Sequence, residues 1–195
     1  MGTKNLQKSG KGLRSILSFL VITLSFIITG RGIAQEQTDP MAATVGQWFM
    51  MIERSFVDLA EAMPADKYDF KPTDGAFGNV RTFGEQVKHV ACANFAFFNQ
   101  IEGEEPPEKC WEGGPDTAKT KAELMVYLRA SFDYAQRVLR KMTAANALDP
   151  VSGPYGGNST RLGITTLAVW HVSDHYGQLV VYLRMNGIVP PASRP

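Results

Sequence analysis

The feature that most restricts the fold of this chain is an apolar repeat of helical period that recurs in four separate stretches. In residues 41–63, large apolar side chains return about every three or four positions, as one buried face of an α-helix requires. The stretches near 82–101, 120–145 and 163–186 repeat this period, and segments rich in proline and glycine separate them. No convincing strand pattern accompanies them. We therefore predict an all-α fold, an antiparallel four-helix bundle, with residues 64–81 as a crossing connection.

Local signals mark where these helices begin and end. Thr82 followed by Glu85 has the spacing of a capping box, and the same pattern recurs at Thr120. The last helix is expected to end at Gly187, because glycine readily takes the left-handed conformation that follows many helices. The Gly-rich run at 153–157 is interpreted as a turn, since it lacks the preceding strand and the following lysine of a phosphate-binding loop.

The first 34 residues differ in composition from the rest of the chain. Basic residues precede an apolar stretch at 16–28, and the small residues Gly32 and Ala34 follow it. This order is typical of a secretory signal peptide, and the apolar stretch is short for a membrane-spanning helix. We expect cleavage after Ala34, export to the periplasm or the medium, and one mature domain over residues 35–195 without a stable membrane anchor. A retained anchor is the alternative.

The distribution of charge excludes one class of partner. The whole chain has a formal charge of +1, and its first 34 residues hold five basic residues and no acidic one, which leaves −4 for the predicted mature domain. Proteins whose main partner is nucleic acid need a basic surface that neutralises phosphates. Because the mature domain is mildly acidic and has no basic stripe, we exclude nucleic acid as its main partner.

Two of the three histidines, His171 and His175, stand four residues apart in the last predicted helix. Residues at this spacing lie on one face, a single turn apart, so both imidazoles can point to a common ion. The third histidine, His89, lies on the second predicted helix. Three imidazoles from two helices would hold a divalent metal and leave coordination positions open, as catalytic metal sites do. The alternative is three histidines that serve only hydrogen bonding in the core.

Two acidic residues are candidates for catalytic or supporting roles near these histidines. Asp174 and Gln178 continue the polar stripe that His171 and His175 begin, and we expect this stripe to face inward because apolar residues flank it. Glu85 shares a face of the second predicted helix with that helix's histidine. Either carboxylate, Asp174 or Glu85, could orient an imidazole or take part in proton transfer.

Cys92 and Cys110 are the only cysteines of the chain. Export would permit them to form a disulfide that ties the loop after the second helix back to that helix. Cys92 also lies near the face of His89, so a thiolate ligand to the same metal is an alternative, as is an inert buried thiol. We rank the disulfide first, the inert thiol second and the metal ligand third.

Taken together, His89 and the H-x-x-x-H and GQL of residues 171–179 resemble the pattern of the DinB/YfiT-like superfamily. The segment PTDGAFGNVRTFGEQVKHV around His89 and the ending YLRMNGIVPPAS are also similar to DinB-like domains, so the likeness covers nearly the whole mature chain. The resemblance implies a four-helix bundle, often dimeric, in which three histidines bind a divalent metal, commonly zinc or nickel, with water completing the shell. Some relatives are transferases or isomerases that use a low-molecular-weight thiol, a cytosolic cosubstrate that export of this chain disfavours.

We therefore predict an exported DinB-like protein that binds a divalent metal, with zinc or nickel as the leading ions and manganese or iron as alternatives. If it is an enzyme, the expected chemistry is metal-dependent hydrolysis, or thiol or group transfer, on a small-molecule substrate. A homodimer is expected from the family resemblance alone. The rival interpretation is a non-catalytic helical module that binds a partner or a small ligand.

Overall fold

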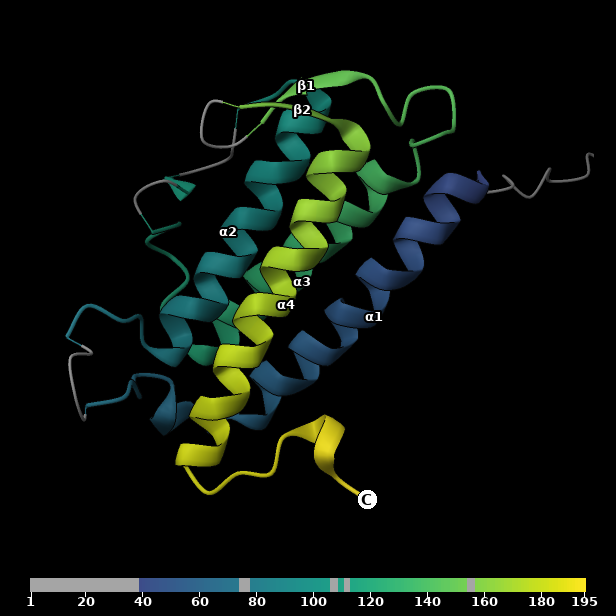
Figure 1. The fold of residues 1–195 in the computed structure, drawn as a ribbon. Helices are drawn as coiled ribbons and strands as arrows, with labels where there is room; N and C mark the ends of the chain where they lie inside the picture. Colours follow the sequence, from purple (N-terminus) through teal and green to yellow (C-terminus); the bar gives the residue numbers. More distant parts are fainter. Residues whose placement is uncertain (1–38, 74–77, 106–108, 111–112, 154–156) are drawn as a thin grey trace, which may run out of the picture. The chain divides into compact units, whose positions relative to one another are not determined.

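The computed structural model describes residues 39–73, 78–105, 109–110, 113–153 and 157–195. These residues form four α-helices and little strand, which confirms the all-α prediction (Figure 1). No helix in this part of the chain is long and apolar enough to cross a membrane. The predicted signal peptide, residues 1–34, lies outside the described residues. The helices are α1 (Pro40–Ala62), α2 (Phe83–Glu102), α3 (Lys121–Leu139) and α4 (Arg161–Met185), with single 3-10 turns η1 (Ala65–Lys67) and η4 (Pro191–Ser193).

Side-chain caps explain where the central helices begin. The Thr82 hydroxyl accepts a hydrogen bond from the Glu85 N–H, and the Glu85 carboxylate accepts one from the Thr82 N–H at 2.7 Å. Thr120 begins α3 with the same reciprocal pair, so both predicted capping boxes are confirmed. α3 ends earlier than predicted, because the side chains of Thr143 and Asn146 hydrogen-bond each other's main-chain N–H groups and form a local turn instead of a further helical one.

The bundle is not antiparallel throughout, which corrects the arrangement predicted from the sequence. Lys141, just beyond the end of α3, forms an ion pair with Glu102, the last residue of α2, so these two helices run in the same direction. The hydroxyl of Tyr182, near the end of α4, donates to the Arg81 carbonyl just before α2 at 3.0 Å, so α2 and α4 are antiparallel. Figure 1 shows α1 and α4 running side by side in one direction.

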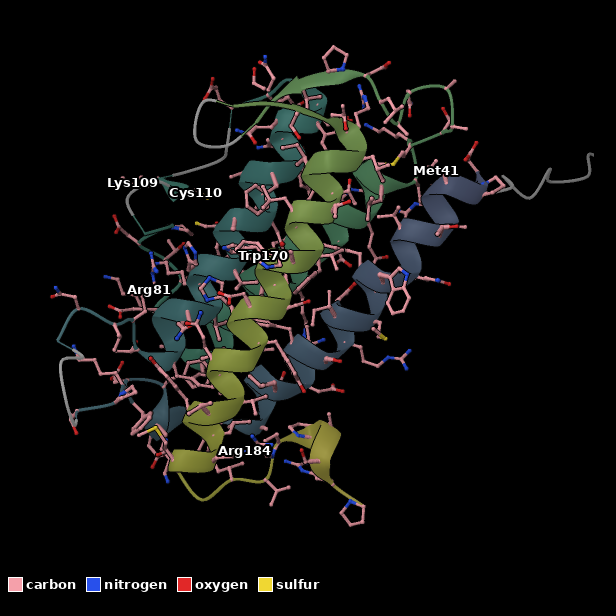
Figure 2. All side chains as sticks on the ribbon, viewed as in Figure 1. Met41, Arg81, Lys109, Cys110, Trp170 and Arg184 are labelled. Carbon is pink, nitrogen blue, oxygen red and sulfur yellow. The ribbon has the colours of Figure 1, made fainter. Side chains whose placement is uncertain are left out.

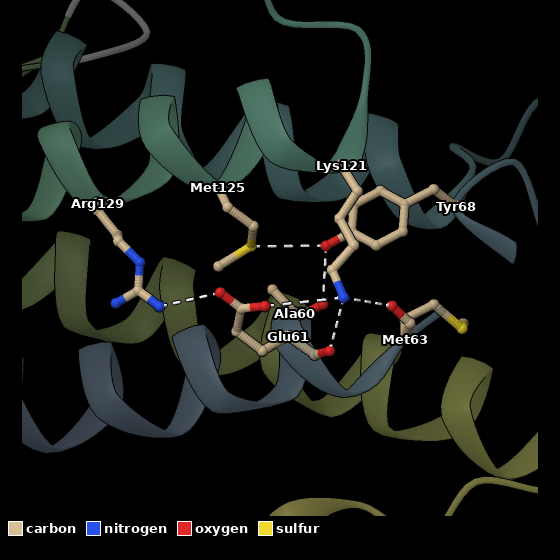
Figure 3. A network of polar contacts seen from close by, with 7 residues as sticks. All are labelled: Ala60, Glu61, Met63, Tyr68, Lys121, Met125 and Arg129. Carbon is tan, nitrogen blue, oxygen red and sulfur yellow. Dashed lines mark hydrogen bonds and ion pairs between the residues drawn. The ribbon is translucent and has the colours of Figure 1, made fainter. Parts of the chain in front are cut away.

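Hydrogen bonds and an ion pair connect the start of α3 to the end of α1 (Figure 3). The ammonium group of Lys121 donates to the main-chain carbonyls of Glu61 at 2.8 Å and of Met63 at 2.9 Å. Arg129, further along α3, pairs with the Glu61 carboxylate at 3.0 Å. A lysine at this place satisfies carbonyls that a helix end leaves without intrahelical donors. α1 and α3 are therefore antiparallel.

The connection that crosses the bundle is residues 103–120, and not the predicted 64–81. After α1, the chain stays at the same end of the bundle, since the Gly84 N–H at the start of α2 donates to the Tyr68 carbonyl at 2.8 Å. α3 begins beside the end of α1, so the chain has to return along the full length of α2 first. Both connections are long and rich in proline and glycine, and for this reason their composition does not distinguish them.

Two short strands, which the sequence analysis did not predict, join α3 to α4. β1 (Pro150–Ser152) pairs antiparallel with β2 (Asn158–Thr160), and Val151 lies opposite Ser159. The Gly153 N–H donates to the Gly157 carbonyl at 2.6 Å, so the two ends of the Gly-rich run lie together, while residues 154–156 of the predicted turn lie outside the described residues. Strands this short leave no alternating pattern to detect. The hairpin leads directly into α4, whose first turn is capped by Thr160.

The core between the helices is apolar and rich in phenylalanine. Phe49 of α1 lies at its centre, with ring centroids 5.3 Å from Phe98 of α2 and 5.5 Å from Phe132 of α3. These three rings are fully buried. Such aromatic packing holds the helices in a defined arrangement and leaves the interface of α2 with α4 as the place where buried imidazoles gather.

Candidate metal centre

The three histidines predicted from the sequence lie together at the interface of α2 and α4. One ring nitrogen of each histidine can be chosen so that all three atoms are within 4.8 Å of one another. The Nε2 atoms of His89 and His171 are 3.2 Å apart. His171 and His175 are each 8% exposed, and His89 is partly buried. The antiparallel course of α2 and α4 brings His89 opposite the pair that is one turn apart on α4.

Ring packing restricts how these imidazoles can turn. The centroids of His171 and His175 are 4.6 Å apart, and the ring of His89 lies 5.1 Å and 4.9 Å from them. Phe97, two turns after His89 on α2, packs perpendicular to His171 at 5.4 Å. The apolar ring covers one side of the cluster and limits the access of water from that side.

Gln86 orients His175 and was not predicted from the sequence. Its side-chain oxygen lies 2.9 Å from Nδ1 of His175, and both side chains are buried. An amide oxygen only accepts, so Nδ1 carries the proton and Nε2 presents its lone pair. The available signal was spacing, because Gln86 precedes His89 by three residues and shares its helix face. Buried partners of this kind fix the tautomer and direction of metal-binding histidines.

His171 has a hydrogen-bonding group that nothing in the described structure satisfies. Its Nδ1 is buried without a hydrogen-bond partner, while its Nε2 faces Nε2 of His89. Two neutral imidazoles that face each other through these atoms can share only one proton between them. A buried polar atom without a hydrogen-bond partner lowers the stability of the folded protein, so hydrogen bonding within the core does not explain this arrangement.

The cluster is held in the uncharged state. Burial lowers the pKa of His89 to about 4, and the nearby positive charge of Arg81 is the second cause. Burial lowers the pKa of His171 to about 3, with His175 and His89 adding to the effect. The pKa of His175 is lowered by burial as well, and Asp174 opposes that shift. The imidazoles are therefore neutral at pH 7, which is the form that binds metals.

The separation of one pair of ring nitrogens fits a transition-metal ion. Imidazole nitrogens bind zinc at about 2.0–2.1 Å, which places two ligands of a tetrahedral ion about 3.3–3.4 Å apart. The 3.2 Å between Nε2 of His89 and Nε2 of His171 is close to this separation. Three nitrogen ligands would complete neither a tetrahedral nor an octahedral shell, so an ion held here would keep open positions. All donors are imidazoles, a set that suits zinc, nickel, copper or iron.

The polar stripe of α4 is divided between the interior and the solvent. His171 and His175 are buried, whereas Asp174 and Gln178 are exposed, and Gln178 Nε2 donates to Asp174 Oδ2 at 2.8 Å. Trp170, an apolar residue that flanks the stripe and is labelled in Figure 2, is 62% exposed. The inward-facing prediction is thus wrong for Asp174 and Gln178, because these residues lie along the outer edge of the stripe.

Neither predicted carboxylate contacts a histidine through a hydrogen bond in the described part of the chain. Glu85 directs its carboxylate to the Thr82 N–H at the start of α2, and Asp174 is engaged by Gln178. The amide of Gln86 takes the orienting position that we had considered for a carboxylate. Catalytic or proton-transfer roles for Asp174 and Glu85 stay predictions.

Cys92 and Cys110 do not form the disulfide that the sequence favoured, and both sulfurs instead lie near the hydroxyl of one tyrosine. The sulfur of Cys92 is 3.1 Å and that of Cys110 is 3.5 Å from the hydroxyl of Tyr127 on α3. The hydrogen-bonded neighbour Cys110, together with burial, raises the pKa of the Cys92 thiol. A protonated thiol is a poor metal ligand, which agrees with the low rank of a thiolate ligand. Tyr127 was not singled out from the sequence.

An open cavity of about 780 Å³ lies beside the histidine cluster. His89 belongs both to this cavity and to the cluster, so the cavity gives a small molecule access to one of the three imidazoles. Arg81 and Cys110 also contribute to its lining, and Figure 2 shows both on the same side of α2. The site therefore combines neutral nitrogen donors with space for a ligand.

Two buried imidazoles and one partly buried imidazole, all neutral, lie together between helices beside a cavity, and these features define a helical bundle with a candidate metal centre. The profile of the DinB superfamily matches residues 51–179, which include all three histidines. The chain belongs to the DinB superfamily, as the resemblance predicted.

A solved structure with a similar fold is that of YjoA, a DinB-like protein of Bacillus subtilis. The two sequences are 23% identical, and the superposition has a TM-score of 0.58 over 74% of this chain and 92% of the other. At this identity the similarity establishes a common fold. A search among curated proteins finds no match.

Proposed function

We propose that this protein binds a divalent metal ion, zinc or nickel first, through His89, His171 and His175. The observation that carries the proposal is the convergence of three neutral ring nitrogens within 4.8 Å, one of which is oriented by a buried amide. The 3.2 Å approach of Nε2 of His171 to Nε2 of His89 adds support, since an ion between these atoms would accept a lone pair from each. Manganese and iron are the alternatives.

We further propose that the centre serves metal-dependent hydrolysis, or thiol or group transfer, on a small molecule that enters the cavity. Lewis acidity is the chemistry that a bound ion would supply. The chain's own residues prepare the site for it. Gln86 holds the proton of His175 on Nδ1, Phe97 covers one side of His171, and His89 opens toward the cavity. Asp174 and Glu85 are the candidate groups for proton transfer, after release from their present hydrogen bonds.

Export and homodimer formation are part of the proposal. The basic and apolar order of residues 1–34 supports export to the periplasm or the medium. N-terminal sequencing of the protein recovered outside the cytoplasm should begin at Gln35. Light scattering of the purified protein should give twice the mass of one chain. An uncleaved N-terminus, or a monomer at every concentration tested, would contradict these two points.

The test of the metal site is the metal content of protein purified without an affinity tag. About one equivalent of zinc, nickel, manganese or iron per chain is expected by mass spectrometry, and the His171→Ala/His175→Ala variant should contain none. Circular dichroism of the variant checks that its helices remain. Protein that stays free of metal after reconstitution, with an unchanged melting temperature, would instead favour the non-catalytic module.

A further inference from the structure

The cavity beside the histidines carries an excess of positive charge. Lys71, Arg81 and Lys88 contribute to its lining, and Glu85 is the single acidic residue among the described lining residues. This local excess contrasts with the predicted mature domain, which is acidic as a whole. A concave site lined by cations attracts anions more strongly than the same charges on a convex surface would.

Glu85 does not neutralise these cations. The Glu85 carboxylate accepts the Thr82 N–H at 2.7 Å and closes the capping box of α2. There its charge is balanced by the positive end of the helix. Among the described residues, none of Lys71, Arg81 and Lys88 takes part in an ion pair. Their charges therefore remain available to a ligand.

The main chain of Arg81 is fixed in place next to the histidines. The hydroxyl of Tyr182 donates to the Arg81 carbonyl at 3.0 Å, and the ring of Tyr182 packs against Phe70 at 5.6 Å. The next residue, Thr82, starts α2. The guanidinium charge of Arg81 is also close enough to lower the pKa of all three histidines. Arg81 thus joins the cationic wall to the candidate metal centre.

Lys88 is held against the loop that forms another wall of the cavity. A side-chain carbon placed on Gly114 would lie only 3.0 Å from Cε of Lys88 and 2.8 Å from the sulfur of Cys92. Gly114 has φ +92°, a conformation that other residues rarely adopt. The close approach of this glycine confines the stem of Lys88, which immediately precedes His89 in the sequence.

We propose that this cavity is the substrate subsite of the metal centre, and that it takes a small molecule with a carboxylate or phosphate group held by Arg81 and Lys88. Such a ligand would place its remaining atoms toward His89, the residue that the cavity and the histidine cluster share. Arginine suits this role because its planar guanidinium can form two parallel hydrogen bonds to either anionic group. The inference rests on the proposed function for the reacting end of the substrate, while the anion site itself does not require a metal.

The probes that test the subsite are inorganic phosphate and acetate, titrated separately into metal-free protein. Amide signals of Thr82 and His89 in nitrogen-15 NMR spectra should shift and saturate with at least one of the two. Comparison of the two titrations shows whether a phosphate or a carboxylate is preferred. The Arg81→Gln/Lys88→Gln variant should bind the preferred anion about tenfold or more weakly, since charge-assisted hydrogen bonds are the strong ones.

The matched control is Arg54→Gln/Arg140→Gln, which removes two exposed cations from α1 and from the end of α3. This control has the same net charge as the test variant and should bind the anion as the parent does. Amide shifts that fail to saturate with both probes would overturn the proposal. So would an equal loss in the control, or undiminished binding by Arg81→Gln/Lys88→Gln.

Metal content separates failure of the subsite from failure of the metal centre. The Arg81→Gln/Lys88→Gln variant should keep its metal, and His171→Ala/His175→Ala should lose the metal while it still binds the anion. If no metal binds to any variant but the anion does, the subsite stands and the metal proposal falls. If metal binds and neither anion does, the metal proposal stands and the subsite falls.

Discussion

Two polar clusters between helices differ in how completely their hydrogen-bonding groups are paired. At the α1–α3 end, the ammonium of Lys121 donates to two carbonyls, and the carboxylate of Glu61 pairs with Arg129. At the α2–α4 interface, Nε2 atoms of His89 and His171 face each other at 3.2 Å, and Nδ1 of His171 has no partner in the described structure. The lysine network finds its hydrogen-bond partners within the protein, whereas the histidine cluster leaves ring nitrogens without suitable partners in the described structure.

This difference separates a structural role from a binding role. A network in which every donor already has an acceptor has no free group for a ligand, so its role is to stabilise the fold. Each neutral imidazole has one donor and one acceptor, and the donor of His175 is engaged by Gln86, so lone pairs outnumber donors within the cluster. An ion that accepts these lone pairs removes the conflict. Metal should therefore stabilise the histidine cluster and leave the lysine network unaffected.

The largest expected effect is the loss of stabilisation by metal in His171→Ala/His175→Ala. Zinc at about 1,000 times its dissociation constant should stabilise the parent protein by about 4 kcal/mol, because only the folded chain presents the three ligands together. The variant should gain almost nothing. Differential scanning calorimetry with and without zinc measures this, and Lys121→Met should respond to zinc like the parent. Equal responses of the two variants would remove the distinction between the clusters.

Lys121→Met should destabilise the protein by about 1–3 kcal/mol, since the carbonyls of Glu61 and Met63 lose their donor. Urea unfolding measures the change. The matched control is Lys109→Met, which removes a lysine that is 56% exposed and paired with the 78% exposed Asp116, whereas Lys121 is 22% exposed. An exposed ion pair contributes about 0–1 kcal/mol, so the control should lose less. Similar losses in both variants would refute a special role for the α1–α3 network.

Gln86→Leu should lower metal affinity about 10–100-fold, because His175 then lacks the acceptor that keeps its proton on Nδ1. Competition with a chromophoric chelator gives the affinity. Gln86→Glu retains an acceptor at the same place and should keep most of the affinity. If Gln86→Leu binds metal as tightly as the parent, the amide does not orient the site.

The stability of the metal-free protein should also depend on pH. The folded-state pKa values of His89 and His171, about 4 and about 3, lie below the ordinary value of 6.5. As the pH falls below 6.5, these histidines become protonated in the unfolded chain but stay neutral in the folded one. The free energy of unfolding therefore has its full value above pH 6.5 and decreases from pH 6.5 toward pH 4. Urea titrations at pH 7 and pH 4.5 should show this loss, and His171→Ala/His175→Ala should reduce it. A parent protein equally stable at both values would contradict the burial of neutral imidazoles.

Much of the fold could be predicted because local rules decide it. Apolar residues at helical spacing located the four helices, and the capping boxes at Thr82 and Thr120 marked two starts to the residue. The end of α3 and the hairpin after it were missed, because a local turn at Thr143 and three-residue strands leave little periodic signal. Helix direction was also wrong, since two connections of similar composition offered the crossing.

The same division applies to the candidate site. Spacing put His171 and His175 on one face, and His89 on another predicted helix completed the set of three, which the family pattern then supported. Gln86 had a local signal in its spacing from His89, but its contact with His175 joins residues far apart in the sequence. The same holds for the place of Arg81 in the cavity and for the thiol contacts of Tyr127, so no local pattern could assign them. Asp174 shares the stripe of His171 yet faces solvent, which only the packing of α2 against α4 reveals.

The sequence by itself determined the helical class, the capped starts and the shared face of His171 and His175, because each depends on neighbours within a few turns of helix. The tertiary structure alone decided that α2 and α3 run parallel, that three imidazoles meet at 3.2 to 4.8 Å and that cations line the cavity beside them. These features arise from contacts between distant segments. Their energies depend on burial and mutual distance, which the order of residues along the chain does not state.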